Sequence, residues 1–334
     1  MKETTTYGLK AFDSTKTRGR IRPGVSHSTD PYIADLIAAT NSPFVRRLAK
    51  KTQVFSPTLP VTNRLTHSLV VMSIATEIAY RTGLNVPMVQ AIAMLHDIGH
   101  TPISHLGERC ITKLSGRTFR HEIMSVNIAK IDINASHETL VGIKMHSRGT
   151  GEMSTDASVS QEYIAVMYAD KIAYVFNDIR DALKIDFIKS HILPVEYQFL
   201  DQKTCIDELV KESLKQGHIS FSHCETAKQF AEIRTWLFAN LYKRIDLTKE
   251  RQAAYSDMCK VYDFLDKNKS LLGLDPLISL IIMDDEEMLR LAAIIPIFEI
   301  KHIAMVSECP WAELHDQLIG INLFDCDLNP ELFS

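Results

Sequence analysis

Apolar residues recur at spacings of three and four residues from about position 31 onward, and this periodicity constrains the fold more than any other feature. Such spacing places apolar side chains on one face of an α-helix, whereas a sustained two-residue alternation would indicate strands and is not seen. With 334 residues and an apolar content of 46%, the chain can bury a sizeable core. The sequence therefore predicts an all-α fold.

Capping residues, glycines and prolines predict where the helices begin and end. We expect helices at about 62–81, 85–95, 104–114, 121–131, 159–184, 203–217, 225–244, 249–269 and 275–295. The segment 147–158 is rich in Ser, Gly, Thr and Asp and is expected to be a loop that can act as a lid.

Residues 1–29 contain six basic residues and little apolar periodicity, which we interpret as a loose basic arm. We expect one domain over 30–334 to follow it. The formal net charge of the whole chain is -4, so no global basic field favours sequence-independent binding of nucleic acid. An anionic ligand would have to meet a local cluster of cations.

The six cysteines include no CxxC pair, which argues against a disulfide framework and against a thiolate zinc site. No segment approaches the roughly 18 uninterrupted apolar residues that span a bilayer. We therefore expect a soluble cytoplasmic protein that does not interact with membranes.

A string of histidines and carboxylates lies where one predicted helix ends. Residues 94–108 contain His96, Asp97, His100, His105 and Glu108. Burying so many polar groups costs free energy unless they find partners, and a divalent metal ion offers that partnership to imidazole and carboxylate groups. The string therefore indicates a metal site at a helix end.

A second His-Asp pair, His315-Asp316, has no other histidine near it. Chance alone gives about one such pair in a chain of this composition. We therefore interpret His315 as a structural residue.

Two further ligands are expected on helices that pack beside His96 and Asp97. His67 lies on the predicted helix 62–81, and Asp170 lies on the predicted helix 159–184. Taken singly, His67 would be a buried core histidine and Asp170 a paired acid. Together with the His96-Asp97 pair they resemble, in order and helical placement, the H…HD…D ligand set of the HD superfamily.

The flanking segments resemble the deoxyguanosine triphosphate triphosphohydrolase branch of that superfamily. The resemblance rests on 42–48, 51–55, 63–69, 96–108, His121-Glu122 and 169–178, and it covers about 42–183. It implies an HD-domain helical fold with a single metal site between packed helices, a core at 42–183 and a C-terminal helical extension. The implied reaction is metal-dependent hydrolysis of a deoxynucleoside triphosphate, with dGTP the expected substrate, to deoxynucleoside and inorganic triphosphate.

The resemblance also implies a role for each site residue. The metal ligands would be His67, His96, Asp97 and Asp170, and the ion Mn²⁺ or Mg²⁺, with Fe, Co, Ni and Zn left open. His105 would be the general acid, Glu108 would orient it, and His100 and His121 would contact the phosphates or the transition state. The residues expected to bind substrate are Gln53 and Asp178 (3′-hydroxyl), Arg64 and Lys171 (phosphates) and Tyr174 (deoxyribose). Arg234 and Tyr242 are expected to close the pocket.

The sequence leaves other functions open. A 5′-nucleotidase or nucleotide phosphodiesterase of the HD type is one alternative, and a non-catalytic nucleotide-binding HD protein is another. All four expected ligands are present, which favours an enzyme over a decayed scaffold. The resemblance implies a homo-oligomer, a hexamer by analogy, and binding of single-stranded nucleic acid stays open as a second activity.

Overall fold

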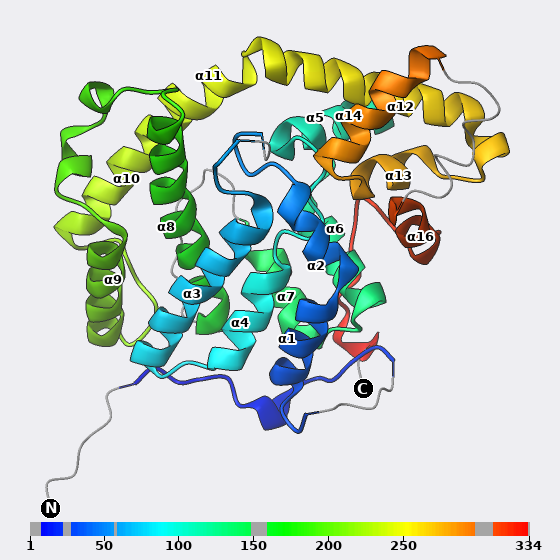
Figure 1. The fold of residues 1–334 in the computed structure, drawn as a ribbon. Coiled ribbons are helices and arrows are strands. Elements are labelled where there is room, and N and C mark those ends of the chain that lie inside the picture. Colours follow the sequence, from blue (N-terminus) through cyan, green and yellow to red (C-terminus); the bar gives the residue numbers. More distant parts are fainter. Residues whose placement is uncertain (1–7, 23–27, 57–58, 148–158, 298–309, 333–334) are drawn as a thin grey trace, which may run out of the picture.

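The computed structural model describes residues 8–22, 28–56, 59–147, 159–297 and 310–332. Within these residues the regular structure is helical, and the only pairing of extended backbone is an isolated bridge between Thr52 and Asn63. The predicted all-α fold is confirmed (Figure 1).

The long helices begin and end close to the predicted positions. The α-helices are α1 (Pro31–Asn41), α2 (Pro43–Arg47), α3 (Arg64–Thr82), α4 (Val86–Leu95), α5 (Ser104–Ser115), α6 (His121–Asp132), α7 (His137–Met145), α8 (Gln161–Lys184), α9 (Gln202–Gln216), α10 (Glu225–Leu237), α11 (Lys243–Asp246), α12 (Lys249–Leu272), α13 (Pro276–Ile282), α14 (Asp285–Ile294) and α16 (Pro310–Gln317). The side chain of Asn63 caps α3, and Gly83 ends it in the left-handed conformation at φ 76°.

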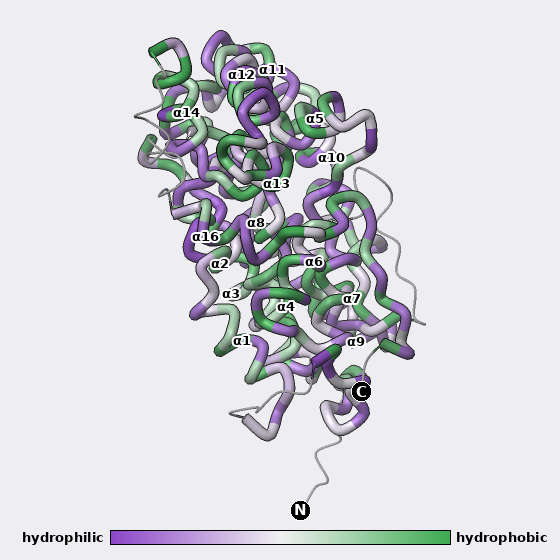
Figure 2. Tube along the Cα trace, turned by 90° about the vertical axis from the view of Figure 1, so that its right-hand side faces the viewer, coloured by the Kyte–Doolittle hydropathy of each residue, from purple (hydrophilic) through white to green (hydrophobic). Residues whose placement is uncertain are grey.

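Helix α4 is the centre of the core. It packs against α1, α3, α7 and α8, and seven of its ten residues are buried. In Figure 2 the trace at α4 is coloured mostly as hydrophobic. Because α4 is held on several sides, the residues that follow its C-terminal end are fixed in position relative to α3 and α8.

Two predicted helices are divided in the structure. The predicted helix 275–295 is α13 and α14, because Asp284 caps α14 in a capping box with Glu287 and so starts a new helix. The predicted helix 225–244 is α10 and α11 joined by a π-helical turn at Phe238–Tyr242. A π turn commonly marks a functional site, and Tyr242 in this one lines the cavity described below.

The prediction of a loose basic arm is wrong for residues 8–22, which pack on the domain. Arg20 forms an ion pair with buried Asp35 at 2.6 Å between Nη1 and Oδ1. The backbone N–H groups of Phe12 and Arg18 donate to the carboxylates of Glu162 and Glu138, both of which are buried. Buried carboxylates need donors, and this segment supplies them.

The predicted lid at 147–158 falls almost entirely on 148–158, which lie outside the described residues. No helix among the described residues is both long and apolar enough to cross a membrane. His315 is buried, and its Nε2 accepts a hydrogen bond of 2.7 Å from the N–H of Asp275, the residue that caps α13. This contact is structural, as predicted for the second His-Asp pair.

Candidate metal centre and active site

The four predicted metal ligands come together in the structure. His67 projects from α3 and Asp170 from α8, and His96 and Asp97 directly follow α4. The Nε2 atom of His67 lies 3.0 Å from Oδ1 of Asp170 and 3.9 Å from Oδ2 of Asp97. The Nε2 atom of His96 lies 3.4 Å from Oδ2 of Asp97 and 4.0 Å from Oδ1 of Asp170. Ligands about 2.1 Å from one ion would be separated by similar distances.

The orientation of His96 fits a metal ligand. Its Nδ1 lies 2.7 Å from the carbonyl oxygen of Ala93, and because a carbonyl only accepts, Nδ1 carries the proton. The Nε2 atom therefore presents a lone pair toward two carboxylates, and it is buried without a hydrogen-bond partner. A lone pair facing carboxylates is stabilised by a cation between them, so the four residues fit a divalent ion.

Gly99 explains how the next histidines reach the site. A Cβ atom at this position would lie 2.3 Å from the backbone nitrogen of Ser125, and the Gly99 N–H donates to the Ser125 hydroxyl at 2.8 Å. The loop after Asp97 therefore lies directly against α6, and His121 at the start of α6 reaches the cluster.

The loop between Asp97 and α5 is strained and is held by a distant carboxylate. Ile103 adopts φ 52° in the left-handed region, which a β-branched residue rarely occupies. Its N–H donates to Oδ1 of buried Asp285 at 3.2 Å, and Asp285 also accepts from the hydroxyl of Thr52. A residue of the C-terminal third thus positions the start of α5, a role that sequence reasoning missed.

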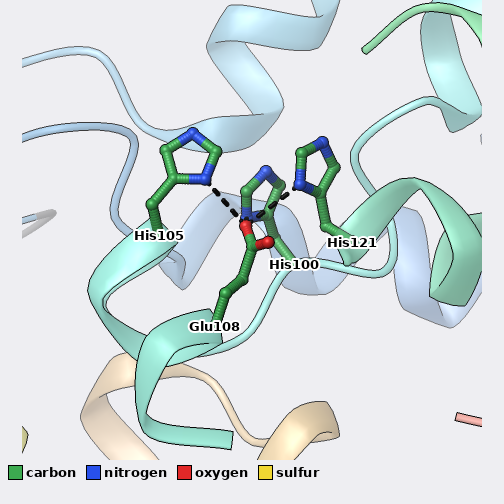
Figure 3. A group of neighbouring side chains, drawn as sticks. All are labelled: His100, His105, Glu108 and His121. Atoms are coloured by element: carbon green, nitrogen blue, oxygen red, sulfur yellow. Dashed lines mark hydrogen bonds and ion pairs between the residues drawn. The ribbon is translucent and has the colours of Figure 1, made fainter. Parts of the chain in front are cut away.

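Glu108 lies at the centre of three histidines (Figure 3). Its Oε1 lies 2.8 Å from Nδ1 of His105, 3.0 Å from Nδ1 of His121 and 3.2 Å from Nδ1 of His100. The rings of His100 and His121 stack with centroids 3.8 Å apart. The side chain of His105 is 63% exposed, whereas His100 and His121 are buried.

The buried carboxylate of Glu108 and the histidines around it stabilise one another's charges. Burial alone would raise the pKa of Glu108, but His121 and His105 hold that pKa well below its usual range. Burial would likewise lower the pKa of His121, but the Glu108 carboxylate raises it to about 9. Burial and the guanidinium of Arg64 hold the pKa of His100 well below its usual value, which keeps His100 neutral.

His146 belongs to the site although the sequence analysis did not select it. It follows the last residue of α7, is buried, and its Nδ1 donates to the carbonyl of Ile143 at 2.6 Å. Its Nε2 lies 3.3 Å from Nε2 of His121. The available signal was a lone histidine at the end of an apolar helix, as at His96, with no neighbouring ligand residue to mark it.

The metal centre opens onto a cavity of about 590 Å³. Eleven of the thirteen predicted site residues line it, namely Gln53, Arg64, His67, Asp97, His100, His105, His121, Asp170, Lys171, Tyr174 and Asp178. The two exceptions, His96 and Glu108, lie behind these side chains and contact them. The cavity is therefore where a substrate would meet the predicted ligands and the predicted acid together.

The predicted substrate contacts also have partners within the protein. Arg64 donates to Oδ2 of Asp97 at 2.6 Å and to the hydroxyl of Ser104 at 2.7 Å. The hydroxyl of Tyr242 donates to Oδ2 of Asp178 at 2.6 Å, and Tyr242 lines the cavity as expected. Arg234 is buried but is not among the lining residues.

Known proteins match both the domain and most of the chain. A family model described as the HD domain matches residues 64–175. A deoxyguanosinetriphosphate triphosphohydrolase-like protein of Clostridium tetani (strain Massachusetts / E88) is 31% identical over 79% of this chain and 80% of its own length. A protein of the same name from Clostridium perfringens (strain 13 / Type A) is 32% identical over 71% of this chain and 74% of its own length. Another, from Desulfatibacillum aliphaticivorans, is 30% identical over 77% of this chain and 80% of its own length. The resemblance seen in the sequence is thus confirmed, and the chain belongs to the HD-domain family of deoxyguanosinetriphosphate triphosphohydrolase-like proteins.

Proposed function

We propose that this protein hydrolyses a deoxynucleoside triphosphate, with dGTP the expected substrate, to the deoxynucleoside and inorganic triphosphate in a metal-dependent reaction. One observation carries the proposal. The side chains of His67, Asp97 and Asp170 line one cavity. Several lysine and arginine side chains line the same cavity, and so do Tyr174 and Asp178. The site thus combines a metal centre, a place for polyphosphate and a place for a sugar.

The phosphate end of the substrate would meet the cationic part of the cavity. The lining cations are Arg64, Arg109, Lys171, Lys243 and Arg251. A nucleoside triphosphate carries about four negative charges, which cations and charge-assisted hydrogen bonds stabilise. Arg64 would contact phosphate while it also holds Asp97, so a single guanidinium connects the metal ligand to the substrate.

The sugar end would meet Gln53, Tyr174 and Asp178. The Oε1 atom of Gln53 is buried without a hydrogen-bond partner, so it can accept from a substrate hydroxyl. Asp170, Tyr174 and Asp178 recur every four residues on α8 and so share one face. With Tyr174 packed against the deoxyribose, a 2′-hydroxyl would have neither space nor a partner, which disfavours ribonucleotides.

The chemistry requires a proton at the leaving oxygen. Water attacks the α-phosphorus, the bond from phosphorus to the 5′-oxygen breaks, and the 5′-oxygen takes a proton to leave as the nucleoside. A divalent ion held by His67, His96, Asp97 and Asp170 would make water a stronger nucleophile and offset charge on the phosphate. His105 is at the cavity with Nδ1 on Glu108, so its Nε2 is the nitrogen that delivers the proton.

The test is an assay of the purified protein against the four dNTPs and four rNTPs with Mn²⁺ or Mg²⁺. Triphosphate, pyrophosphate and nucleoside monophosphate are separated and counted. We expect triphosphate and deoxynucleoside in equal amounts, no turnover after chelation, and slower turnover of rNTPs. Release of pyrophosphate with monophosphate, or turnover that resists chelation, would contradict the proposal.

The assembly remains a prediction. By family resemblance we expect a homo-oligomer, with a hexamer as the specific expectation, and light scattering after size-exclusion chromatography measures it. Binding of single-stranded nucleic acid is a separate question, which a titration at several salt concentrations would answer because phosphate contacts weaken as salt rises.

A further inference from the structure

A second cavity, of about 430 Å³, borders the C-terminal half of α8. The residues of α8 that line it share one face of the helix and include Phe176, Asn177, Arg180 and Lys184. The residues of α8 that line the cavity of the metal centre lie on a different face. Among the described residues, none lines both cavities, so the second cavity is a separate pocket.

The side-chain amide of Asn177 offers an unpartnered donor to this cavity. Nη2 of Arg180 donates to Oδ1 of Asn177 at 2.8 Å, and because a guanidinium has no acceptor, the oxygen of the amide must face it. The Nδ2 atom is therefore the donor that remains, and it is buried without a hydrogen-bond partner. Asn177 is only 3% exposed. A buried donor without an acceptor costs free energy, so a ligand that accepts from Nδ2 would be stabilised.

Gln202 supplies a second donor from a different element. It is the first residue of α9 and lines the same cavity. Its Nε2 atom is buried and also lacks a hydrogen-bond partner. The N-terminal end of a helix carries partial positive charge, which favours a negatively charged acceptor at this position. Two unpartnered amide donors, one from α8 and one from α9, thus border one cavity.

The charges around the cavity also favour an anion. Arg180 and Lys184 lie one turn apart on α8, and the described residues that line the cavity include no carboxylate. Both cations donate to uncharged oxygens, Arg180 to the amide of Asn177 and Lys184 to the carbonyl of Pro60. An uncharged acceptor leaves the charge of a cation uncompensated, and a guanidinium has further N–H groups to donate. A phosphate or carboxylate group would supply both the negative charge and the acceptors.

Two aromatic rings form an apolar wall of the same cavity. Phe176 lies beside Tyr197 of the 3-10 helix η4 (Val195–Gln198), with ring centroids 6.1 Å apart and ring planes at 31°. Such rings offer a flat apolar surface, against which another flat group packs well. The wall indicates that the ligand carries a planar ring as well as a charged group.

We propose that this cavity binds a small organic anion, in which a phosphate or carboxylate group is attached to a planar ring. The charged group accepts from Asn177, Gln202 and Arg180, and the ring packs on Phe176 and Tyr197. A volume of about 430 Å³ is within the range of small-molecule sites. The site is independent of the hydrolysis proposed above, because none of the described residues that line it belongs to the metal centre or lines its cavity.

Binding is measured by isothermal titration calorimetry on the full chain with phenyl phosphate, benzoate, inorganic phosphate and phenol as probes. We expect at least one of the two ring anions to bind at least about tenfold more tightly than inorganic phosphate and phenol, which each lack one half of the ligand. The tighter binder of phenyl phosphate and benzoate identifies the charged group. Equal affinity for phenol or for inorganic phosphate would contradict the proposal, and no binding of either ring anion would overturn it.

Two variants locate the site. Arg180→Gln removes an exposed cation, and Asn177→Leu removes the amide donor at nearly constant size. Each should weaken the binding of the preferred ring anion by at least about tenfold, as expected when a hydrogen bond to a charged group is lost. The matched control is Arg290→Gln, which changes an exposed arginine that is bound to Glu286 one turn away on α14 and should bind the probe as wild type does. Circular dichroism confirms that the variants are folded. Wild-type affinity in Arg180→Gln or in Asn177→Leu would place the ring anion elsewhere and overturn the site.

Discussion

Oε1 of Glu108 lies 3.0 Å from Nδ1 of His121, a residue 13 positions later on a different helix. The same oxygen lies 2.8 Å from Nδ1 of His105, the only partner that the sequence analysis gave to Glu108. One carboxylate therefore orients the exposed ring that is the proposed acid and the buried ring beside the metal centre. The sequence-based role of Glu108 is narrower than the role that the geometry indicates.

We predict that Glu108→Gln lowers the pKa of His121 from about 9, because the neutral amide no longer stabilises the imidazolium while burial still disfavours it. The measurement is a histidine NMR titration of the metal-free protein. Turnover should also fall, though less than on removal of His105. An unchanged His121 titration would show that Glu108 does not govern its charge.

Asp97→Ala should lose hydrolysis and metal together, since a carboxylate that faces both His67 and His96 cannot be replaced by a methyl group. Metal content and turnover are measured on the same preparation. His315→Ala is the control and should keep both. It removes the acceptor of the Asp275 N–H, so it should lower stability by about 1–3 kcal/mol. Full metal content in Asp97→Ala would show that the first His-Asp pair is structural.

The helical periodicity and the His96-Asp97 pair could be recognised in the sequence because each has a local signal. The apolar spacing marks the helices, and the adjacent His96 and Asp97 mark a helix end. His67 and Asp170 had no such signal and were selected through the resemblance to the ligand set of the HD superfamily; the structure brings both to the same cluster. The break before α14 also had a signal, since Asp284 followed by Glu287 is a capping-box pattern.

The rest of the site depends on contacts between distant segments. Asp285 holds Ile103 from 182 positions away, and residues 8–22 are fixed by carboxylates at 35, 138 and 162. His146 has no ligand residue near it in the sequence and joins the site only because α7 packs on α4 and α8. Such residues can be identified only when the packing of the helices is known.

Tyr174→Ala should weaken the discrimination between deoxyribose and ribose, because removing the ring opens space in the cavity for a 2′-hydroxyl. We expect the ratio of kcat/KM for dGTP over GTP to fall by at least about tenfold, mainly through better use of GTP. Metal content should not change. An unaltered ratio would place the sugar elsewhere in the cavity.

Asp178 gives a prediction about stability and pH. Burial raises its pKa to about 8 although the Tyr242 hydroxyl donates to it, so the folded state favours the protonated form. The stability that the protonated Asp178 contributes to the folded state is fully present below about pH 4, the pKa range of an unfolded Asp. It is lost as pH rises to about 8. Asp178→Asn cannot ionise, so its Tm should rise relative to wild type between pH 5 and pH 8. If the Tm of Asp178→Asn and the Tm of wild type changed in parallel with pH, the raised pKa of Asp178 would be contradicted.

The last prediction concerns His105, which is separated from the ligand pair by the strained loop at Ile103 and stands at the rim of the cavity. His105→Ala should bind metal and dNTP nearly as wild type does and should lose at least about a hundredfold in kcat, as expected when a general acid is removed while the binding groups remain. Its side chain is 63% exposed, so truncating it leaves no cavity in the core and should not impair folding. Loss of metal in this variant would make His105 a ligand and shift the search for the acid to His100 or His121. Wild-type turnover would mean that the proposed proton transfer is wrong. The contact between His105 and Glu108 would then be only the ordinary pairing of a histidine with an acid one helical turn away.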